Sequence, residues 1–494
     1  MITKFFGEIQ SLFNTRQRRE VLVALTAAYM VVQLQSLPIA LALPTLAEYF
    51  STGIDDVALL VVIYLLMLGS LVLLMARLGD RLGHAKVFFT GLVITTVGAI
   101  GLSVTQDLWQ MVALRGVTGV GAAMVTGNAN ALLAVEFTPD ERGRAFAIPI
   151  VGARFGTLTG LAVFGLLLHF GLWRLIFATF VPLGIVAILV SIPMLRHTDQ
   201  PKTAGAQGPI DWSGATLLFL GAVAFILAGN HLHVGEESYT SPDALAYHIP
   251  MHALTLLLVG AFIIVERRVA NPVVDIGHFK NWNFSLSLLS NVIFHGSMLG
   301  TLTLVPILVE EGFDKSPIFV TYVLVPMQSL GLFLPAIAGW VYDRYRPRYL
   351  RMWSLVLIAG GFMLLSMAAP NVSFWWLPLF MLPIAIGTNT FNPINNAHVI
   401  NSLSLEHRGV ASGMLETSRE MGHALGGTAA AAVLGLVIPA GVEALPFIDS
   451  RGFFLEGFQL SAMTVVAALL VGALLVYFQQ ATRIKIETIT GSDG

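Results

Sequence analysis

The stretch at residues 76–86 reads Ala-Arg-Leu-Gly-Asp-Arg-Leu-Gly-His-Ala-Lys and separates two long apolar runs. Its glycines permit a tight turn, and its basic residues can anchor at the inner surface of a membrane. A related pair, Asp343-Arg344, follows another apolar run about 265 residues later. Short charged turns between apolar runs predict helices that cross a membrane and return.

The composition of the whole chain supports this prediction. Of its 494 residues, 56% are hydrophobic and 11% are charged, whereas soluble domains are about 25% charged. The net charge of -2 argues against a nucleic-acid partner, which requires a strongly basic surface. The chain contains no cysteine, so disulfides, thiol catalysis and thiolate metal sites are excluded. We therefore expect an integral membrane protein whose solvent is the lipid bilayer.

Apolar runs of about 20 residues, the length that crosses the hydrocarbon core, occur fourteen times. We expect spans at approximately residues 21–43, 57–75, 87–104, 109–135, 145–170, 173–194, 212–228, 249–265, 284–309, 318–341, 349–369, 374–396, 410–438 and 458–478. Most Lys and Arg then lie in cytoplasmic segments, and only Arg174, Lys315 and Arg451 lie in outer loops. This asymmetry predicts an even number of spans with both termini in the cytoplasm.

Similar residues recur in register along the two ends of the chain. Asp80-Arg81 returns as Asp343-Arg344, Arg142-Gly143 as Arg408-Gly409, Arg154 as Arg419, and Gly156 and Gly160 as Gly422 and Gly426. Two six-helix halves with two helices inserted between them explain this register. We expect an amphipathic and basic segment at 1–20, a six-helix bundle at 21–195, a linker with two additional helices at 196–283, a second bundle at 284–478 and a tail at 479–494.

Several motifs resemble those of the major facilitator superfamily. Residues 76–86 resemble its motif A, although a plain basic loop is the alternative, and residues 115–123 resemble motif B. Gly156, Gly160 and Gly165 resemble motif C of exporters, with Leu161 and Phe164 where Pro and Gly are usual. The segments at 173–177, 211–214 and 271–275 resemble the fourteen-helix drug:proton antiporter group of this superfamily.

The resemblance implies an all-α membrane fold with fourteen helices, and it implies gating or structural roles for a set of residues along the chain. These are Asp80, Arg81, Gly83, Arg142, Arg154, Gly156, Gly160, Asp343, Arg344 and Arg419. Arginines within spans are costly and are functional candidates by default. For Arg115, near the outer end of its span, snorkelling to the surface is the alternative.

One departure from the resembling group concerns proton coupling. Its first span usually holds an Asp where this chain has Gln35, and an amide cannot titrate. We expect coupling to be absent or to use Glu416, Glu420 or His295, which lie within later spans. The spacing of Glu416 and Arg419 places both on one helical face, so a charge pair that only makes burial tolerable is the alternative. For His295, the alternative is a hydrogen-bonded cavity residue.

Polar residues on two repeat-related spans are the remaining candidates for a substrate cavity. We expect the substrate cavity to be lined by polar and charged residues within the spans. These are Gln35, Arg115, Asn128, Asn130, His295, Asn389, Asn392 and Asn395. Hydrogen bonding between helices is the alternative for the amides. His231 and His233 have the spacing of a metal site, but we interpret them as solvated residues of an outer loop.

The function that these observations predict is secondary active export of lipophilic or amphipathic small molecules by alternating access, with proton coupling left open. An exporter of an endogenous anionic or zwitterionic amphiphile, with atypical or no coupling, is the alternative, and a membrane sensor that does not transport is a remote one. The chain lacks a phosphate-binding loop and any convincing nucleophile constellation. We expect no enzymatic activity, no metal and no cofactor. A monomer in the cytoplasmic membrane of a bacterium is the expected form.

Overall fold

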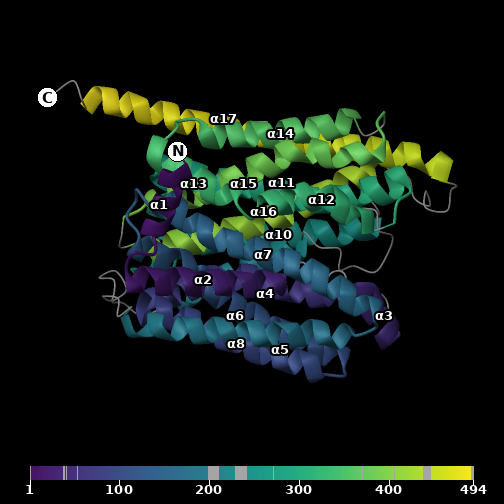
Figure 1. Ribbon diagram of the computed structural model, residues 1–494, viewed down its shortest axis with the longest axis horizontal. Helices are drawn as coiled ribbons and strands as arrows, with labels where there is room; N and C mark the ends of the chain where they lie inside the picture. Colours follow the sequence, from purple (N-terminus) through teal and green to yellow (C-terminus); the bar gives the residue numbers. More distant parts are fainter. Residues whose placement is uncertain are drawn as a thin grey trace.

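The computed structural model of the protein describes residues 2–36, 39, 42–52, 54–197, 211–228, 242–270, 272–316, 318–368, 371–404, 407–437 and 447–490. Within these ranges the chain is helical and contains no β-strand. Residues 198–210 of the predicted linker, and the pair His231 and His233, lie outside the described residues. The helices run side by side, and both chain ends lie at the same end of the bundle (Figure 1).

The helices form two halves with a pair of helices between them in sequence. A short helix, α1 (Ile2–Ser11), precedes the first half. The first half contains α2 (Arg16–Leu34), α3 (Leu43–Phe50), α4 (Ile54–Leu82), α5 (His84–Val104), α6 (Leu108–Glu136), α7 (Arg142–His169) and α8 (Trp173–His197). The second half contains α11 (Trp282–Phe313), α12 (Ile318–Leu330), α13 (Leu334–Tyr345), α14 (Leu350–Ala368), α15 (Leu377–Asn401), α16 (Arg408–Val437) and α17 (Phe447–Thr490).

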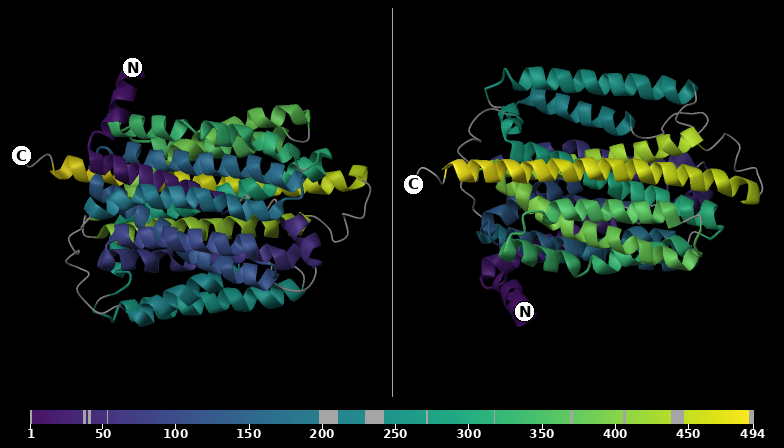
Figure 2. Two further views of the ribbon diagram at one scale, coloured as in Figure 1. Left: turned by 60° about the horizontal axis from the view of Figure 1, so that its bottom comes forward. Right: turned by 90° about the horizontal axis from the view of Figure 1, so that it is seen from above.

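The inserted pair, α9 (Trp212–Ala228) and α10 (Pro242–Glu266), packs at one edge of the bundle (Figure 2). α9 contacts α10, α4 and α16. The outer face of α10 is apolar and exposed, since the exposed fractions of Leu256 and Leu257 are 73% and 71%. A soluble protein rarely exposes so continuous an apolar surface, so this face lies against lipid.

Each of the fourteen expected spans coincides with a helix or with two consecutive helices. Eleven helical segments among the described residues are long and apolar enough to cross a membrane, and α9 is a shorter apolar helix. Because the bilayer offers no hydrogen-bond partners, backbone groups within it must bond to one another, which a helix achieves along its length. The structure is therefore an all-α integral membrane fold, as predicted, while the number of membrane crossings stays a prediction.

The helices differ from the expected spans in three places. α2 ends at Leu34, with Gln35 as its C-cap, well before residue 43. The tenth expected span is two helices, because turn residues 331–333 separate α12 from α13. α17 continues as a helix through the predicted tail to Thr490 and extends beyond the rest of the bundle (Figure 1). The first two breaks are short interruptions in runs that are apolar on average, and the tail that α17 continues through is polar, so hydropathy along the chain does not place these helix ends.

Small residues let equivalent helices approach closely in both halves. A Cβ atom on Gly156 of α7 would lie 2.5 Å from the carbonyl oxygen of Met30 on α2. In the second half, a Cβ atom on Gly422 of α16 would lie 2.5 Å from the carbonyl oxygen of Val292 on α11. Gly160 is buried in the same part of α7. The repeat in the sequence therefore corresponds to a repeated helix packing.

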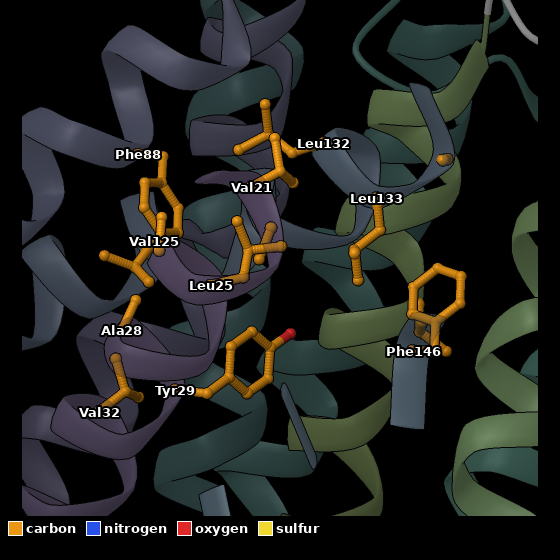
Figure 3. Packing of buried hydrophobic residues seen from close by; sticks show 14 of the residues in the cluster. Val21, Leu25, Ala28, Tyr29, Val32, Phe88, Val125, Leu132, Leu133 and Phe146 are labelled. Carbon is orange, nitrogen blue, oxygen red and sulfur yellow. The ribbon is translucent and has the colours of Figure 1, made fainter. Parts of the chain in front are cut away.

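One apolar cluster packs around α2 and contains residues of α5, α6 and α7 as well as residues of α11, α15 and α16 from the second half. Figure 3 shows Leu25 and Ala28 of α2 close to Val125 of α6, with Phe88 of α5 beside it. These side chains are buried. The second half has its own core, formed by α11, α14, α15 and α17 among others. The first cluster thus also packs the two halves against each other.

Two adjacent glycines of α14 provide a test of the helix packing. A Cβ atom on Gly361 would lie 2.5 Å from Ile384 Cγ1 on α15, whereas one on Gly360 would meet nothing within 4 Å. We expect Gly361→Leu to destabilise the protein by about 1–3 kcal/mol through overpacking. Gly360→Leu, the matched control, should leave stability unchanged. Thermal unfolding of the purified protein in detergent measures both, and equal melting temperatures for the two variants would contradict this packing.

Candidate functional site

A chain of polar contacts crosses from the first half to the second in the interior of the bundle. The Tyr29 hydroxyl donates to Asn130 Oδ1 at 3.4 Å, and Asn130 Nδ2 donates to Glu416 Oε1 at 2.8 Å. The other carboxylate oxygen of Glu416 lies 2.6 Å from Arg419 Nη1. The Arg419 guanidinium lies close enough to the Tyr29 hydroxyl to interact with it. Side chains from α2, α6 and α16 thus form one network across the contact between the halves.

Burial makes this network expensive to disturb. The side chain of Glu416 is 2% exposed, and that of Arg419 is 17% exposed. Removing one partner of a buried ion pair costs about 3–5 kcal/mol, because the other charge is left uncompensated. Asn130 adds a hydrogen bond from the opposite half to the same carboxylate. The protonation state of Glu416 therefore affects both its ion pair and the contact between the halves.

A second chain of titratable groups continues along α16. Glu420 Oε2 lies 3.5 Å from His423 Nδ1, and His423 Nε2 lies 3.3 Å from His295 Nδ1 on α11. His295 is 5% exposed, and its Nε2 atom is buried without a hydrogen-bond partner. Glu420 and His295, two of the three predicted proton-coupling residues, therefore belong to this second chain of contacts. The third, Glu416, belongs to the first network. His423, which links Glu420 and His295, was not among those candidates, although its spacing of three residues from Glu420 places it on the same face.

Three arginines in the interior lack a carboxylate partner among the described residues. Arg115 is fully buried on α6. Its Nε donates to the Leu60 carbonyl at 2.8 Å, its guanidinium carbon lies 4.2 Å from the centre of the Tyr64 ring, and Nη1 and Nη2 have no hydrogen-bond partner. Arg351 donates to Asn395 Oδ1 at 3.0 Å and to Gln479 Oε1 at 2.7 Å.

The third arginine, Arg154 of α7, lies against Gly331 in the turn between α12 and α13. Arg419 and His295 are close enough to interact with it electrostatically. Arg351 lies near the start of the expected span at 349–369 but was not a predicted site residue, and its side chain is buried within α14 at 3% exposure. A single arginine at the start of an apolar run gives no sign of whether its side chain points into the bundle, so this residue was missed.

The predicted cavity amides differ in what they contact. Asn128 Nδ2 donates to the carbonyl groups of Met75 and Met124, and Asn389 makes the equivalent bonds to Met327 and Ala385. These two amides join helices within one half. Asn395 Oδ1 accepts a hydrogen bond from Arg351. The Oδ1 atom of Asn392 has no hydrogen-bond partner.

Gln35 is buried at the end of α2, and neither its Nε2 nor its Oε1 atom has a hydrogen-bond partner. A buried amide without partners costs free energy, which a bound molecule can recover. Among the predicted cavity amides, Gln35, Asn392 and, through its Oδ1 atom, Asn389 therefore have hydrogen-bonding capacity left for a ligand.

The cytoplasmic end of the interface is closed by carboxylates that meet helix N-termini. Asp343 of α13 accepts hydrogen bonds from the backbone N–H groups of Gly143 and Arg144 at 3.0 and 2.9 Å, and from Arg144 Nε at 3.0 Å. The N-terminus of a helix favours a nearby negative charge, so the Asp343 carboxylate stabilises the start of α7. Asp80 lies against Gly409 at the start of α16 in the equivalent position. Arg81 beside it is partly exposed.

Further contacts at this end involve the turns and α1. Arg142 bonds to Asn401, and Ser412 Oγ donates to the Gly127 carbonyl at 2.7 Å. Glu8 of α1 lies 2.8 Å from Arg344 Nη1 and 3.2 Å from Arg144 Nη1, so it touches both halves. The described hydrogen bonds and ion pairs between the halves lie in the cytoplasmic half of the bundle or near its middle. The structure is therefore closed toward the cytoplasm.

A loop at this end has a carboxylate outside the spans whose charge is stabilised. Burial raises the pKa of Glu141, but hydrogen bonds from Arg18 and Thr138 outweigh this effect, and the pKa lies below its ordinary value. Two nitrogen atoms of Arg18 donate to the two oxygen atoms of Glu141 at 3.1 and 2.9 Å. This pair fixes the loop before α7 to the start of α2.

The closure can be tested because the chain has no cysteine of its own. We expect Asp343→Asn to open the cytoplasmic side more often, since hydrogen bonds to a charged acceptor are worth about 1.5–3 kcal/mol. A cysteine introduced at the buried Ser412 should then react about tenfold faster with an impermeant thiol reagent added to the cytoplasmic face. Asp314→Asn, at an exposed outer position, is the matched control. An unchanged rate in the Asp343 variant would show that this carboxylate does not hold the closure.

Comparison with known proteins gives one family. The family model described as Major Facilitator Superfamily matches residues 22–427. The riboflavin transporter RibZ of Clostridioides difficile (strain 630) is 23% identical over 420 residues, covering 83% of this chain and 87% of its own. The multidrug efflux pump LfrA of Mycolicibacterium smegmatis is 25% identical over 425 residues, covering 85% and 80%. The human organic anion transporter MFSD10 has a similar fold, with a TM-score of 0.62 at 14% identity, covering 94% of this chain and 100% of its own.

Proposed function

We propose that this chain, which belongs to the major facilitator superfamily, exports lipophilic or amphipathic small molecules by alternating access. It is a multi-pass membrane transporter, and its bacterial relatives place it in the cytoplasmic membrane. Multidrug efflux proteins are among these relatives. The name of the efflux pump LfrA supports export as the direction, and all three names support drugs as the substrates.

The observation that carries the proposal is the Glu416 network between the halves. Alternating access exchanges closure on one side of the membrane for closure on the other. When the cytoplasmic side opens, Asn130 and Glu416 must separate, because they belong to different halves. A charged Glu416 is held by Arg419 and Asn130 together, whereas protonation removes its charge and weakens both interactions. Glu416 is therefore the group through which a proton can favour opening.

The test is transport by the purified protein in lipid vesicles under an imposed pH gradient. We expect the wild-type chain to accumulate substrate and the Glu416→Gln variant to lose gradient-driven accumulation while it still exchanges substrate across the membrane. Loss of both activities would assign Glu416 a structural role in the pair with Arg419. Glu456→Gln, which makes the same change at an exposed position of α17, is the matched control.

The arginines without carboxylate partners favour a second candidate, an exporter of anionic or zwitterionic amphiphiles. Arg115 has two guanidinium nitrogens with no hydrogen-bond partner, and the charge close to Arg154 is that of another arginine, Arg419. A buried cation is strongly stabilised by a bound anion. Such a substrate supplies the negative charge that this part of the interior lacks.

The same vesicles distinguish the two candidates when they are loaded with either ethidium, a lipophilic cation, or a dansyl-labelled fatty acid, an anionic amphiphile. If the second candidate holds, Arg115→Gln reduces transport of the fatty acid about tenfold or more, since a charge-assisted hydrogen bond is lost. Arg16→Gln, at an exposed cytoplasmic position, should change neither rate. Faster transport of ethidium than of the fatty acid would reject the second candidate.

A further inference from the structure

The base of the inserted pair, α9 and α10, contains two buried carboxylates that belong to neither network described above. Asp211 immediately precedes α9, Glu266 is the last residue of α10, and their exposed fractions are 7% and 3%. A Cβ atom on Gly214 of α9 would lie 2.3 Å from Asp211 Oδ2 and 2.3 Å from Glu266 Oε1. The two oxygen atoms therefore face the same small space, which a residue larger than glycine would occupy.

One oxygen atom of this carboxylate pair lacks a hydrogen-bond donor. Asp211 Oδ1 accepts a hydrogen bond from the Gly214 backbone N–H at 2.9 Å. Glu266 Oε1 and Oε2 accept hydrogen bonds from the backbone N–H groups of Val273 and Val274, at 3.2 and 3.1 Å. Asp211 Oδ2, by contrast, is buried and has no hydrogen-bond partner among the described residues. A buried acceptor without a donor is costly, and beside a second acceptor a proton held between the two removes that cost.

The charges around the pair favour one proton as well. The charged groups that act on Glu266 are Asp211 and Arg77 of α4, so one cation faces two carboxylates. Arg77 is also engaged elsewhere, because its Nε and Nη2 atoms donate to the carbonyl groups of Val273 and Pro272. The titratable groups beyond Arg77 are Asp80, Arg81, His84, Asp275 and His278. Two adjacent buried carboxyl groups do not readily ionise together, so one of them keeps a proton.

We propose that Asp211 and Glu266 hold one proton between them, and that this proton keeps residues 272–274, the strap, attached to α4. Glu266 accepts hydrogen bonds from two backbone N–H groups of the strap, and Arg77 donates to two of its carbonyl groups. The strap therefore joins the inserted pair to the turn at residues 76–86. A metal cation is a poorer occupant than a proton, because Arg77 already supplies a positive charge and such an ion requires about six oxygen ligands.

Loss of this proton changes the electrostatics around the strap. It leaves two adjacent negative charges, which repel each other and attract the Arg77 guanidinium away from the strap carbonyls. The strap therefore loosens as the cytoplasmic pH rises. Asp80, in the same turn as Arg77, meets the start of α16 at the cytoplasmic closure. The inserted pair thus communicates cytoplasmic acidity to that closure, and only this last step rests on the proposed function.

Infrared spectroscopy of the full chain in lipid nanodiscs tests whether the proton is present. Between about pH 6 and about pH 9, where free carboxyl groups are already ionised, we expect the wild type to lose one protonated-carboxyl band. Asp211→Asn and Glu266→Gln should each abolish this change, because the remaining carboxyl group has a neutral neighbour and ionises at lower pH. Asp314→Asn, at an exposed outer position, is the matched control and should retain it. The proposal fails if the wild type shows no such change, or if both variants titrate as the wild type does.

Hydrogen–deuterium exchange of the strap amides tests the attachment. The N–H groups of Val273 and Val274 exchange only when their bonds to Glu266 open. Asn caps a helix as well as Asp does, and at position 211 its amide can donate to Glu266 without titrating, so Asp211→Asn mimics the protonated pair. Over the same pH range we expect protection in the wild type to fall about tenfold relative to this variant.

Comparing the two proteins at each pH cancels the base-catalysed part of exchange. Equal protection of the strap in both proteins at every pH would overturn its dependence on the proton, and Glu266→Gln repeats the infrared measurement if Asp211→Asn does not fold. A rise in wild-type melting temperature with added sodium or calcium ions, lost in both variants, would show that a metal occupies the site instead. Because none of these measurements involves transport, their outcomes are independent of whether the chain is an exporter.

Discussion

A charge in the interior of a bilayer is stable only where another group neutralises or solvates it, and this cost explains where the polar residues of this chain lie. Glu416 and Arg419 neutralise each other on one helix, and Asn130 satisfies the remaining oxygen from another. At the cytoplasmic end, Asp343 takes its hydrogen bonds from the start of α7. Carboxylates thus occupy the contact between the halves, where the partners that they need come from both sides.

The same cost separates what the sequence could predict from what it could not. Apolar runs had to become helices, and basic residues had to remain on the cytoplasmic side, so the fold class and the helical repeat followed from hydropathy and charge. Spacing placed Glu416 and Arg419 on one face of a helix. The contact of Glu416 with Asn130 depends on how α6 and α16 are rotated toward each other, which periodicity along one helix does not determine. The role of Tyr29 depends on the same rotation.

The ends of α2 and α12 were not predicted for a different reason. α2 ends just before Gln35 and Ser36, and α12 ends just before Gly331, and these short interruptions were included in the predicted apolar spans. Arg351 was missed for a related reason, since a basic residue near a span end can turn either toward the headgroups or into the bundle. Its partners, Asn395 and Gln479, lie far away in the sequence. Such pairings are properties of the packed bundle rather than of any segment.

The participation of α1 in the cytoplasmic closure affects the thermodynamics of the transport cycle. Glu8 contacts Arg144 and Arg344 through partly exposed side chains, and such ion pairs contribute about 0–1 kcal/mol each. These pairs therefore add a small part to a closure whose stronger contacts are the hydrogen bonds to Asp343 and the network of Glu416. Reversing a two-state population from 1:99 to 99:1 requires about 5.5 kcal/mol. Weak contacts such as those of Glu8 change this requirement only slightly, so α1 adjusts the balance between two conformations without fixing it.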